Sequence, residues 1–261
     1  MKSSGAAKSV LQKGLLFCLF FFPVFAAGFS PIQNTPAPKS SINISSAAFL
    51  YNEGEKLRVE GNFEKAESLF SRSLAAARKE KNPNRELDAL ISLGLIYWNV
   101  GLVKESADFF ADALTLAKNS SNKEKEADCS LYLEIYRLYQ ESKNLRSTKE
   151  YDKAIECFQK AIGLSIKIES LEHEVKCLRQ LSTIYWELNN LNDYYLYSER
   201  ALKIAITLNH KKEQAYCFNN IGLYYWKIDS YSKSLLNYEK ALSLSREIKN
   251  VQIQSDCLNN I

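Results

Sequence analysis

Cysteine is the residue type with the most chemical potential in this sequence, because its thiolate is both a nucleophile and a metal ligand. Four of the six cysteines, Cys129, Cys177, Cys217 and Cys257, occupy the same place in successive similar segments. A zinc site needs cysteines or histidines clustered at short spacings, and the sequence contains no such cluster. We therefore expect these cysteines, together with Cys157, to be small buried side chains.

The two histidines offer a second route to chemistry. His173 stands four residues before Cys177, so a helix would place both on one face, as a Cys/His nucleophile pair requires. The alternative is a surface histidine beside a core cysteine, and we favour it because no orienting third group is identified. The sequence also contains no glycine-rich phosphate loop, nucleophile elbow or metal-ligand motif. We predict that these residues form no enzyme active site, no metal site and no cofactor site.

The segments that must position these residues recur along the chain. Gly54, Gly94, Ser182 and Gly222 occupy equivalent places in segments that each have the pattern of two amphipathic helices joined by a tight turn. The interval between equivalent places is about 40 residues, and a recurrence of this length predicts an all-α solenoid. The interval from Gly94 to Ser182 is twice as long. We interpret it as two copies, with Glu134 in place of the small residue in the degenerate inner copy.

Five helical hairpins and a truncated sixth account for the chain from residue 47 to residue 261. Their predicted bounds are 47–79, 85–118, 124–169, 172–208, 213–248 and 251–261. About eight extra residues, around 141–148, separate the halves of the third hairpin and either lengthen its helices or form a loop. Cys257-Leu-Asn-Asn-Ile repeats Cys217-Phe-Asn-Asn-Ile. We therefore expect the sequence to stop in mid-helix and to be a fragment of a longer protein.

Helix spacing also bears on the repeated cysteines. Helices that pack side by side lie roughly 10 Å apart, whereas a disulfide needs Cα atoms within about 7 Å. The cysteines of successive hairpins are therefore expected to stay unpaired, although free cysteines are unusual in an exported protein.

The N-terminal segment has the composition of an export signal. Lys2, Lys8 and Lys13 precede an unbroken apolar run, Leu15–Phe22, and the residues around Ala26 suit cleavage. We interpret residues 1–27 as a signal peptide or membrane anchor. Residues 28–46, rich in Pro, Ser, Asn and Thr, have the composition of a disordered linker. The expected location is extracytoplasmic (periplasmic or secreted), with membrane attachment only through an uncleaved anchor.

The charge balance argues against a polyanionic partner. The formal net charge is +4, but three of the lysines belong to the N-terminal segment, which contains no acidic residue. The rest of the chain is close to neutral, whereas nucleic-acid binding requires clustered basic charge. We therefore expect no nucleic-acid partner.

The residues at fixed places in each hairpin resemble the signature of the tetratricopeptide repeat, in which small and aromatic residues alternate. The second hairpin carries Gly94, Tyr97, Ser106, Phe110 and Ala113, and the fifth carries Gly222, Tyr225, Ser234, Tyr238 and Ala241. The third hairpin departs at Glu134 and Arg137, and the fourth reverses the usual order at Tyr194 and Ser198. The resemblance implies stacked hairpins whose small residues let the paired helix approach. The length of the period resembles arrays found beside CHAT-type peptidase, histidine kinase and cyclase domains of bacterial proteins.

In the family, the first helix of each repeat lines the inside of the superhelix, and ligands lie along it. Carried over column by column, the resemblance implies these partner-binding residues: Tyr51, Asn52, Trp98, Tyr132, Lys176, Arg179, Gln180, Trp186, Asn219, Asn220 and Trp226. Paired asparagines can hydrogen-bond an extended peptide, and tryptophan is typical of interface hot spots. The alternatives are that the tryptophans pack between neighbouring first helices and that Lys176 and Arg179 belong to a solvated face. The basic and asparagine set with which such repeats clamp a C-terminal carboxylate is not reproduced.

The sequence thus predicts a non-enzymatic scaffold that binds a protein or peptide segment in the groove of a superhelix. A second hypothesis is the sensory or regulatory arm of a larger bacterial enzyme, a CHAT-type peptidase or a histidine kinase, whose catalytic domain lies outside this chain. A third is a structural array that self-associates through its uncapped C-terminal end.

Overall fold

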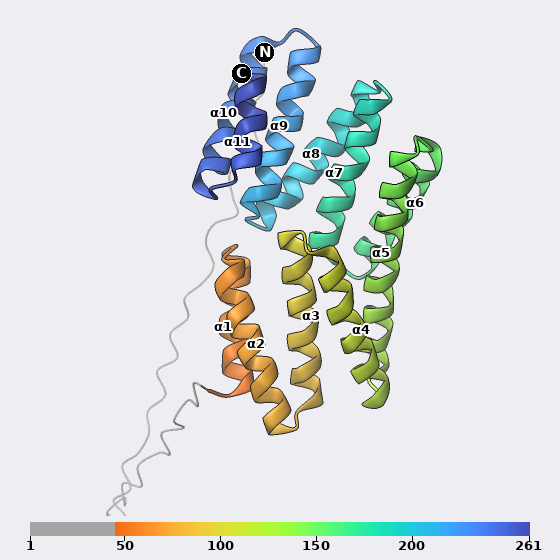
Figure 1. Ribbon diagram of the computed structural model, residues 1–261, viewed down its shortest axis with the longest axis vertical. Coiled ribbons are helices and arrows are strands. Elements are labelled where there is room, and N and C mark those ends of the chain that lie inside the picture. Colours follow the sequence, from red (N-terminus) through yellow and green to blue (C-terminus); the bar gives the residue numbers. More distant parts are fainter. Residues whose placement is uncertain (1–44) are drawn as a thin grey trace, which may run out of the picture. The chain divides into compact units, whose positions relative to one another are not determined.

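Eleven α-helices and no strand make up residues 45–261, the part of the chain that the computed structural model describes (Figure 1). The helices are α1 (Ala47–Val59), α2 (Phe63–Glu80), α3 (Pro83–Val100), α4 (Val103–Asn119), α5 (Lys123–Ser147), α6 (Tyr151–Lys167), α7 (Leu171–Glu187), α8 (Leu191–Thr207), α9 (Lys211–Lys227), α10 (Tyr231–Glu247) and α11 (Val251–Asn260). They pair in chain order as hairpins, so the predicted all-α solenoid is confirmed. The predicted signal segment and nearly all of the predicted linker lie outside the described residues.

A residue with left-handed backbone ends each helix from α1 to α10 and sets the repeat length. These residues have φ between +50° and +101° and recur every twentieth position except across α5: Gly61, Lys81, Gly101, Ser121, Lys149, Glu169, Asn189, Asn209, Asp229 and Lys249. Beyond each of them, an amide bonds back to the last helical turn, as Asn82 N–H does to the Ala77 carbonyl at 2.9 Å. The Asn82 side chain then accepts from Arg85 N–H at 3.1 Å and begins the next helix.

In the first, second and fifth hairpins, a glycine of the first helix lies under an aromatic ring of the second helix. A Cβ atom added at Gly94 would lie 2.8 Å from the ring of Phe110, and one at Gly222 would lie 2.6 Å from the ring of Tyr238. A serine of the second helix reinforces the contact, because Ser106 Oγ donates to the Gly94 carbonyl at 2.7 Å. The expectation that small residues permit close approach of the paired helices is therefore confirmed.

The third hairpin also has a small residue on its first helix before the aromatic residue of its second helix, but at a different position from the predicted one. α5 has 25 residues, whereas α7 and α9 have 17 each, so the extra residues lengthen the first helix and form no loop. Ser142 is fully buried and stands as far before Phe158 in sequence as Gly94 stands before Phe110. The assignment of Glu134 to the small position is therefore wrong. Glu134 lies about two helical turns earlier and pairs with Arg137 at 2.7 Å.

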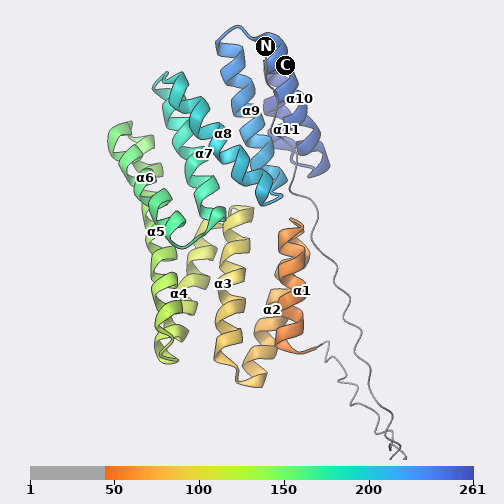
Figure 2. The ribbon, with the colours of Figure 1, turned by 180° about the vertical axis from the view of Figure 1, so that it is seen from behind.

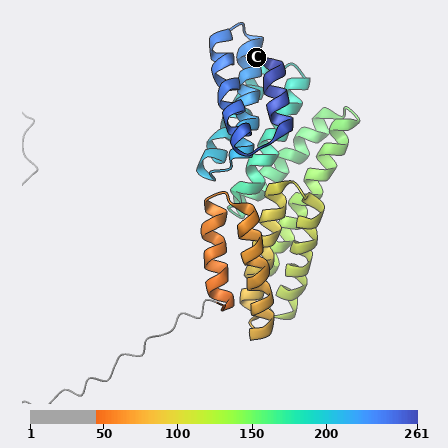
Figure 3. The same ribbon diagram turned by 60° about the vertical axis from the view of Figure 1, so that its left-hand side comes forward.

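Stacking of the hairpins brings first helices together. α1 contacts α3, α5 contacts α7, and α7 contacts α9, which contacts α11; Figure 3 shows α9, α10 and α11 side by side. The end of α3 also meets the start of α7, although the whole third hairpin separates them in sequence (Figure 2). Trp98 of α3 and Leu178 of α7 belong to one apolar cluster. This contact between the end of α3 and the start of α7, which we call the junction, organises the candidate site.

Membrane-spanning character is not found in the described helices: none in residues 45–261 is both long and apolar enough to cross a bilayer.

Candidate partner-binding face

Many of the predicted partner-binding residues bond to the neighbouring hairpin. Ser92 Oγ lies 3.3 Å from Tyr51 Oη, Arg146 Nη1 donates to Gln180 Oε1 at 3.4 Å, and Asn260 Nδ2 donates to Asn219 Oδ1 at 3.1 Å. The partners of these bonds stand 34 to 41 residues apart, which is close to one repeat. Some of the predicted partner-binding residues therefore form hydrogen bonds that join one repeat to the next.

Arg179 also bonds to the neighbouring hairpin. Its Nε donates to Glu213 Oε2 at 2.6 Å, and its guanidinium lies 4.6 Å from the centroid of the Tyr216 ring. Only 16% of the Arg179 side chain and 1% of the Glu213 side chain are exposed. Burial acts to raise the pKa of Glu213, but Arg179, Lys176 and His210 outweigh it and lower that pKa to about 2. The pair is a buried ion pair, so Arg179 does not belong to a solvated face.

Trp98 is fully buried and bridges α3 to α7. Its ring stacks on His173 with the centroids 4.2 Å apart and the planes at 27°. Its Nε1–H donates to the backbone carbonyl of Glu172 at 2.9 Å. In the opposite direction, Lys176 Nζ donates to the backbone carbonyl of Trp98. Two predicted partner-binding residues, Trp98 and Lys176, therefore bind each other's helices inside the fold.

The surroundings of Lys176 are unusual for an ammonium group. Lys176 is 4% exposed, and burial is the main cause that lowers its pKa to about 8, although Glu213 acts in the opposite direction. Tyr132 of α5 is also buried here: its ring stacks on Phe110 at 4.3 Å and lies 5.1 Å from His173. Tyr132, like Trp98, contacts the chain itself.

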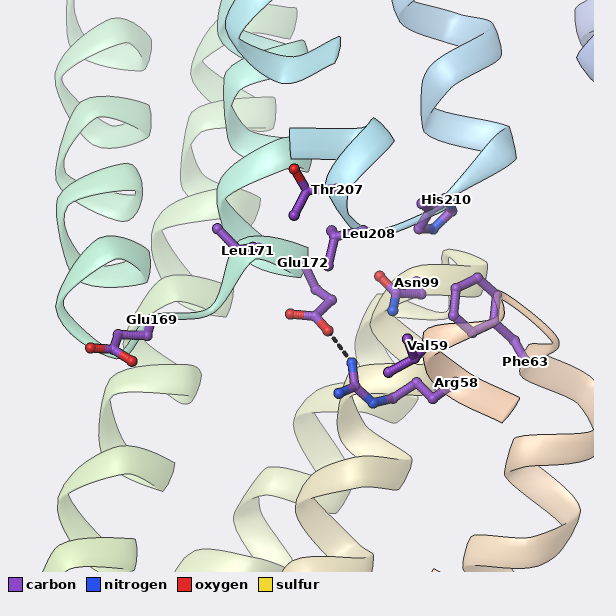
Figure 4. Close-up of a pocket in the computed structure, with 10 residues that line it drawn as sticks. All are labelled: Arg58, Val59, Phe63, Asn99, Glu169, Leu171, Glu172, Thr207, Leu208 and His210. Atoms are coloured by element: carbon purple, nitrogen blue, oxygen red, sulfur yellow. Dashed lines mark hydrogen bonds and ion pairs between the residues drawn. The ribbon is translucent and has the colours of Figure 1, made fainter. Parts of the chain in front are cut away.

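Three polar contacts extend the junction to the first and fifth hairpins. Arg58 of α1 pairs with Glu172 of α7, as Figure 4 shows. Asn209 Nδ2 donates to the Glu60 carbonyl at 3.2 Å, and Lys212 Nζ donates to the Val100 carbonyl at 3.3 Å. The ends of α1 and α3 thus contact the starts of α7 and α9. These contacts join hairpins that are not adjacent in sequence.

This junction also holds cavities and unpaired polar atoms. A cavity of about 230 Å³ lies between Arg58, Asn99, Glu172 and His210 (Figure 4), and a second of about 620 Å³ shares Asn99 and His210 with it. Asn99 Oδ1, His173 Nε2 and His210 Nε2 are buried and have no hydrogen-bond partner within the described chain. Such groups normally find partners, so this interface is imperfectly satisfied.

His173 is not the surface residue that we favoured from the sequence. It is fully buried, its Nδ1 lies 2.8 Å from Ser170 Oγ, and burial lowers its pKa to about 3. Cys177 is also buried, and burial raises the pKa of its thiol to about 12, which opposes formation of a nucleophilic thiolate. The pair is packed inside the fold because Trp98 of α3 and Tyr132 of α5 both contact the first turns of α7.

Four predicted residues are at least partly exposed and make no side-chain hydrogen bond within the described chain. Asn52 and Trp226 are exposed, Trp226 to 50%, and Asn220 is partly exposed. None of these three side chains makes a hydrogen bond within residues 45–261. Trp186 is partly exposed and contacts Tyr194 of its own hairpin, with ring centroids 4.9 Å apart. The side chains of these four residues are therefore not committed to hydrogen bonds between repeats.

Sequence reasoning missed Asn99, Glu172 and His210, which complete the junction. Their only signal is a helix-end position beside a turn residue, and that position does not reveal a partner in a hairpin that is not adjacent in sequence.

The cysteines follow the expectation. Cys129, Cys177, Cys217 and Cys257 are fully buried, Cys157 is nearly so, and all five are free. Within residues 45–261, no group of three or more His, Cys, Asp or Glu side chains is placed to hold a metal ion.

Family models for the tetratricopeptide repeat match residues 45–119, 136–165 and 215–248, together more than half of the sequence. The chain belongs to the tetratricopeptide repeat family. Repeats of this family form protein-interaction scaffolds and are typically non-catalytic. The comparison with curated proteins gives no match.

Solved structures share the fold at low identity. The TPR domain of P58(IPK) is similar with a TM-score of 0.54 and 13% identity, over 83% of this chain and 55% of that one. A signal transduction ATPase with a tetratricopeptide repeat sensor from Pyrococcus horikoshii gives 0.49 and 19%, over 84% and 38%. A Rap conjugation regulator of plasmid pLS20, in complex with the Phr* peptide, gives 0.47 and 14%, over 87% and 62%. The chain therefore spans less than two thirds of each of these three proteins.

Proposed function

We propose that this chain is a non-catalytic scaffold that binds a peptide or protein segment along the inner face of its first helices. The observation that carries the proposal is the contrast between Trp98 and Trp226, which hold the same place in their repeats. Trp98 is fully buried against α5 and α7, whereas Trp226 is 50% exposed and has no hydrogen-bond partner within the described chain.

Trp98 provides an internal precedent for the recognition that Trp226 can make. Its indole combines a stacked ring with an N–H bond to a backbone carbonyl, the two contacts that a tryptophan offers to a peptide. Tryptophan is enriched among interface hot spots. We therefore assign Trp226, with Trp186 one hairpin earlier, as aromatic anchors for a partner.

Asn52 and Asn220 supply the polar part of the proposed face. Each amide side chain has a donor and an acceptor, and neither is used within the described chain. An extended segment has unpaired N–H and C=O groups along its length, so amides spaced one or more repeats apart suit it. Arg179 is excluded from this role, because its guanidinium is committed to Glu213.

The proposal is tested by selecting peptides from a displayed random library against the purified chain and measuring Kd by fluorescence anisotropy. Trp226→Ala and Asn220→Ala should each weaken a selected peptide at least about tenfold, as expected for hot-spot residues. Leu196→Ala is the matched control, since Leu196 is an exposed apolar residue on the second helix α8. Unchanged affinity in both inner-face variants would show that the partner binds elsewhere.

We also propose that the chain is exported through its N-terminal segment. The support is the order of basic residues, apolar run and small residues in residues 1–27. The test is to express the full sequence in a bacterium and determine the N-terminus of the mature protein. A product beginning near Ala27 in an extracytoplasmic fraction is expected, and a product that keeps Met1 in the cytoplasm would contradict export.

A further inference from the structure

We infer that the first turns of α7 form a receptor for an aromatic side chain and an adjacent backbone carbonyl, and that the chain's own α3 tip, Trp98–Val100, now occupies it. A partner segment of the same chemistry would compete with this tip. The inference rests on the proposed function, and it names both the partner's chemistry and the regulation of its binding. We call the contact of Trp98–Val100 with α7 and α9 the α3 latch.

The receptor has one part for each feature of its occupant. His173 stacks on the indole of Trp98 at 4.2 Å, and the Glu172 carbonyl accepts the indole N–H at 2.9 Å. Lys176 donates to the carbonyl of Trp98, and the ring of Tyr139 of α5 packs against the indole in a T-shaped arrangement with the ring centroids 5.0 Å apart. The occupant is therefore recognised through one aromatic side chain and one backbone carbonyl. Any peptide that presents a tryptophan at the end of a helical turn has these groups.

The latch differs from the contacts inside the hairpins. Inside the second and fifth hairpins, the ring packs so closely that a single Cβ atom on the opposing glycine would collide with it. At the latch, cavities of about 230 and 620 Å³ adjoin the contact, and Asn99 Oδ1, His173 Nε2 and His210 Nε2 are buried without partners in the described chain. Opening would let water reach these three atoms, so it recovers hydration that closure forfeits. The contact is suited to separate while each hairpin stays intact.

The buried charges at the latch also favour its opening. Lys176 is 4% exposed, and Glu172 is 7% exposed with Arg58 as its ion-pair partner across the junction. Taking these charges out of water opposes closure, while the ion pair and the carbonyl bonds favour it. Because the cost of desolvating the charges opposes these polar bonds, loss of a few of the bonds should shift the equilibrium between the closed and open forms towards the open form.

Opening would also enlarge the proposed binding face. Trp98 and Lys176 are predicted partner-binding residues, but in the closed form they contact each other's helices. A partner anchored at Trp226 could use them only after the α3 tip has left. The apparent affinity of the chain for such a partner is then the affinity of the open form multiplied by the fraction of molecules that are open.

The test uses a triple variant, Arg58→Ala with Asn209→Ala and Lys212→Ala, in the full chain. These three side chains are exposed or partly exposed and bridge the junction, so their removal leaves the hairpin cores intact. The matched control is Arg146→Ala, which removes an ion pair of 2.5 Å between α5 and α7 away from the latch. Circular dichroism and thermal unfolding check that both variants are folded.

The first readout is hydrogen exchange of the Trp98 indole N–H, followed by NMR and assigned with Trp98→Phe. The indole N–H of Trp98 should exchange at least about ten times faster in the triple variant than in the wild type, with Arg146→Ala unchanged, because opening breaks its bond to Glu172. The second readout is Kd for a peptide selected as described above. It should be at least about threefold tighter for the triple variant, and a peptide carrying tryptophan should lose that gain when the tryptophan is replaced by alanine.

Each outcome bears on one proposal. An unchanged indole exchange rate in the triple variant would overturn the latch, whatever the peptide affinities are. Faster exchange with an unchanged Kd would overturn its regulatory role. If no peptide binds either form, the proposed function fails, and the exchange rate alone decides whether the latch opens.

Discussion

Gly222 and Tyr238 face each other across the fifth hairpin so closely that a methyl group on the glycine would lie 2.6 Å from the tyrosine ring. The ring is held from the other side as well, because Tyr238 is 2% exposed. The same relationship links Gly94 with Phe110 and Gly54 with Phe70. The glycine therefore sets the distance between the two helices of the hairpin.

Gly222→Ala should destabilise the protein by about 1–3 kcal/mol, because the added Cβ forces the ring or the helix to move in a packed core. Gly163→Ala is the matched control. Gly163 lies within α6 and has nothing within 4 Å of its would-be Cβ, so alanine should stabilise by roughly 0.5–1 kcal/mol through helix propensity. Urea unfolding measures both, and equal effects of the two substitutions would contradict the close-approach role.

Arg179 should be required for stability. Arg179→Ala leaves the carboxylate of Glu213 buried without its partner, which costs about 3–5 kcal/mol for a buried pair. Arg137→Ala is the control: it removes an arginine that pairs with Glu134 and Glu141 on the surface of α5, and exposed pairs contribute little. The measurement is the free energy of unfolding at neutral pH. A small effect at Arg179 would show that Glu213 is readily hydrated.

His173 should make the protein sensitive to acid. Burial, assisted by Lys176, lowers its pKa to about 3 in the folded chain, whereas the unfolded chain has the ordinary value of 6.5. Between these values the unfolded chain binds more protons, so the free energy of unfolding should fall as pH decreases from about 6.5 towards 3. The largest slope from one such group is about 1.4 kcal/mol per pH unit.

His173→Phe tests this pH dependence, because phenylalanine keeps a ring against Trp98 and cannot titrate. The difference in unfolding free energy between wild type and variant should shift in favour of the variant as pH is lowered from 7 to 4. A difference that stays constant over this range would mean that His173 is already protonated or hydrated in the folded chain.

Ser142, and not Glu134, should behave as the small residue of the third hairpin. Ser142→Leu should destabilise by about 1–3 kcal/mol, because Ser142 is fully buried on the first helix of the pair. Glu134→Leu should be far milder, since 42% of the Glu134 side chain is exposed. Thermal unfolding distinguishes the two positions, and the reverse order of effects would restore the original alignment.

Most of the fold could be predicted from the sequence because its signals are local. Apolar periodicity specifies each helix, and turn residues such as Gly61 and Gly101 end it with a positive φ that glycine readily adopts. The third hairpin was misaligned for a physical reason: eight added residues make about 2.2 helical turns, so alignments anchored on Cys129 or on Ser142 both bury apolar side chains. The missing glycine removed the signal that would have decided between them.

The candidate site was less predictable, because side chains in one sequence column have different environments. Trp98 and Trp226 occupy equivalent positions, yet one is buried and the other is 50% exposed. Trp98 is buried by Tyr139 of α5, in the adjacent hairpin, and also by Glu172 and His173 of α7, which the whole third hairpin separates from α3 along the chain. A repeat signature describes contacts with adjacent hairpins and carries no information about a contact that skips one.

By itself the sequence determined the helices, their pairing into hairpins and the membership of the chain in the tetratricopeptide repeat family, because hydrophobic periodicity and turn geometry act over a few residues. Only the tertiary structure decided which inner-face residues hold the chain together and which remain free. That decision depends on α3 meeting α7 across an intervening hairpin, and burial, ion pairing and the unpaired atoms at that junction all follow from the stacking of many repeats.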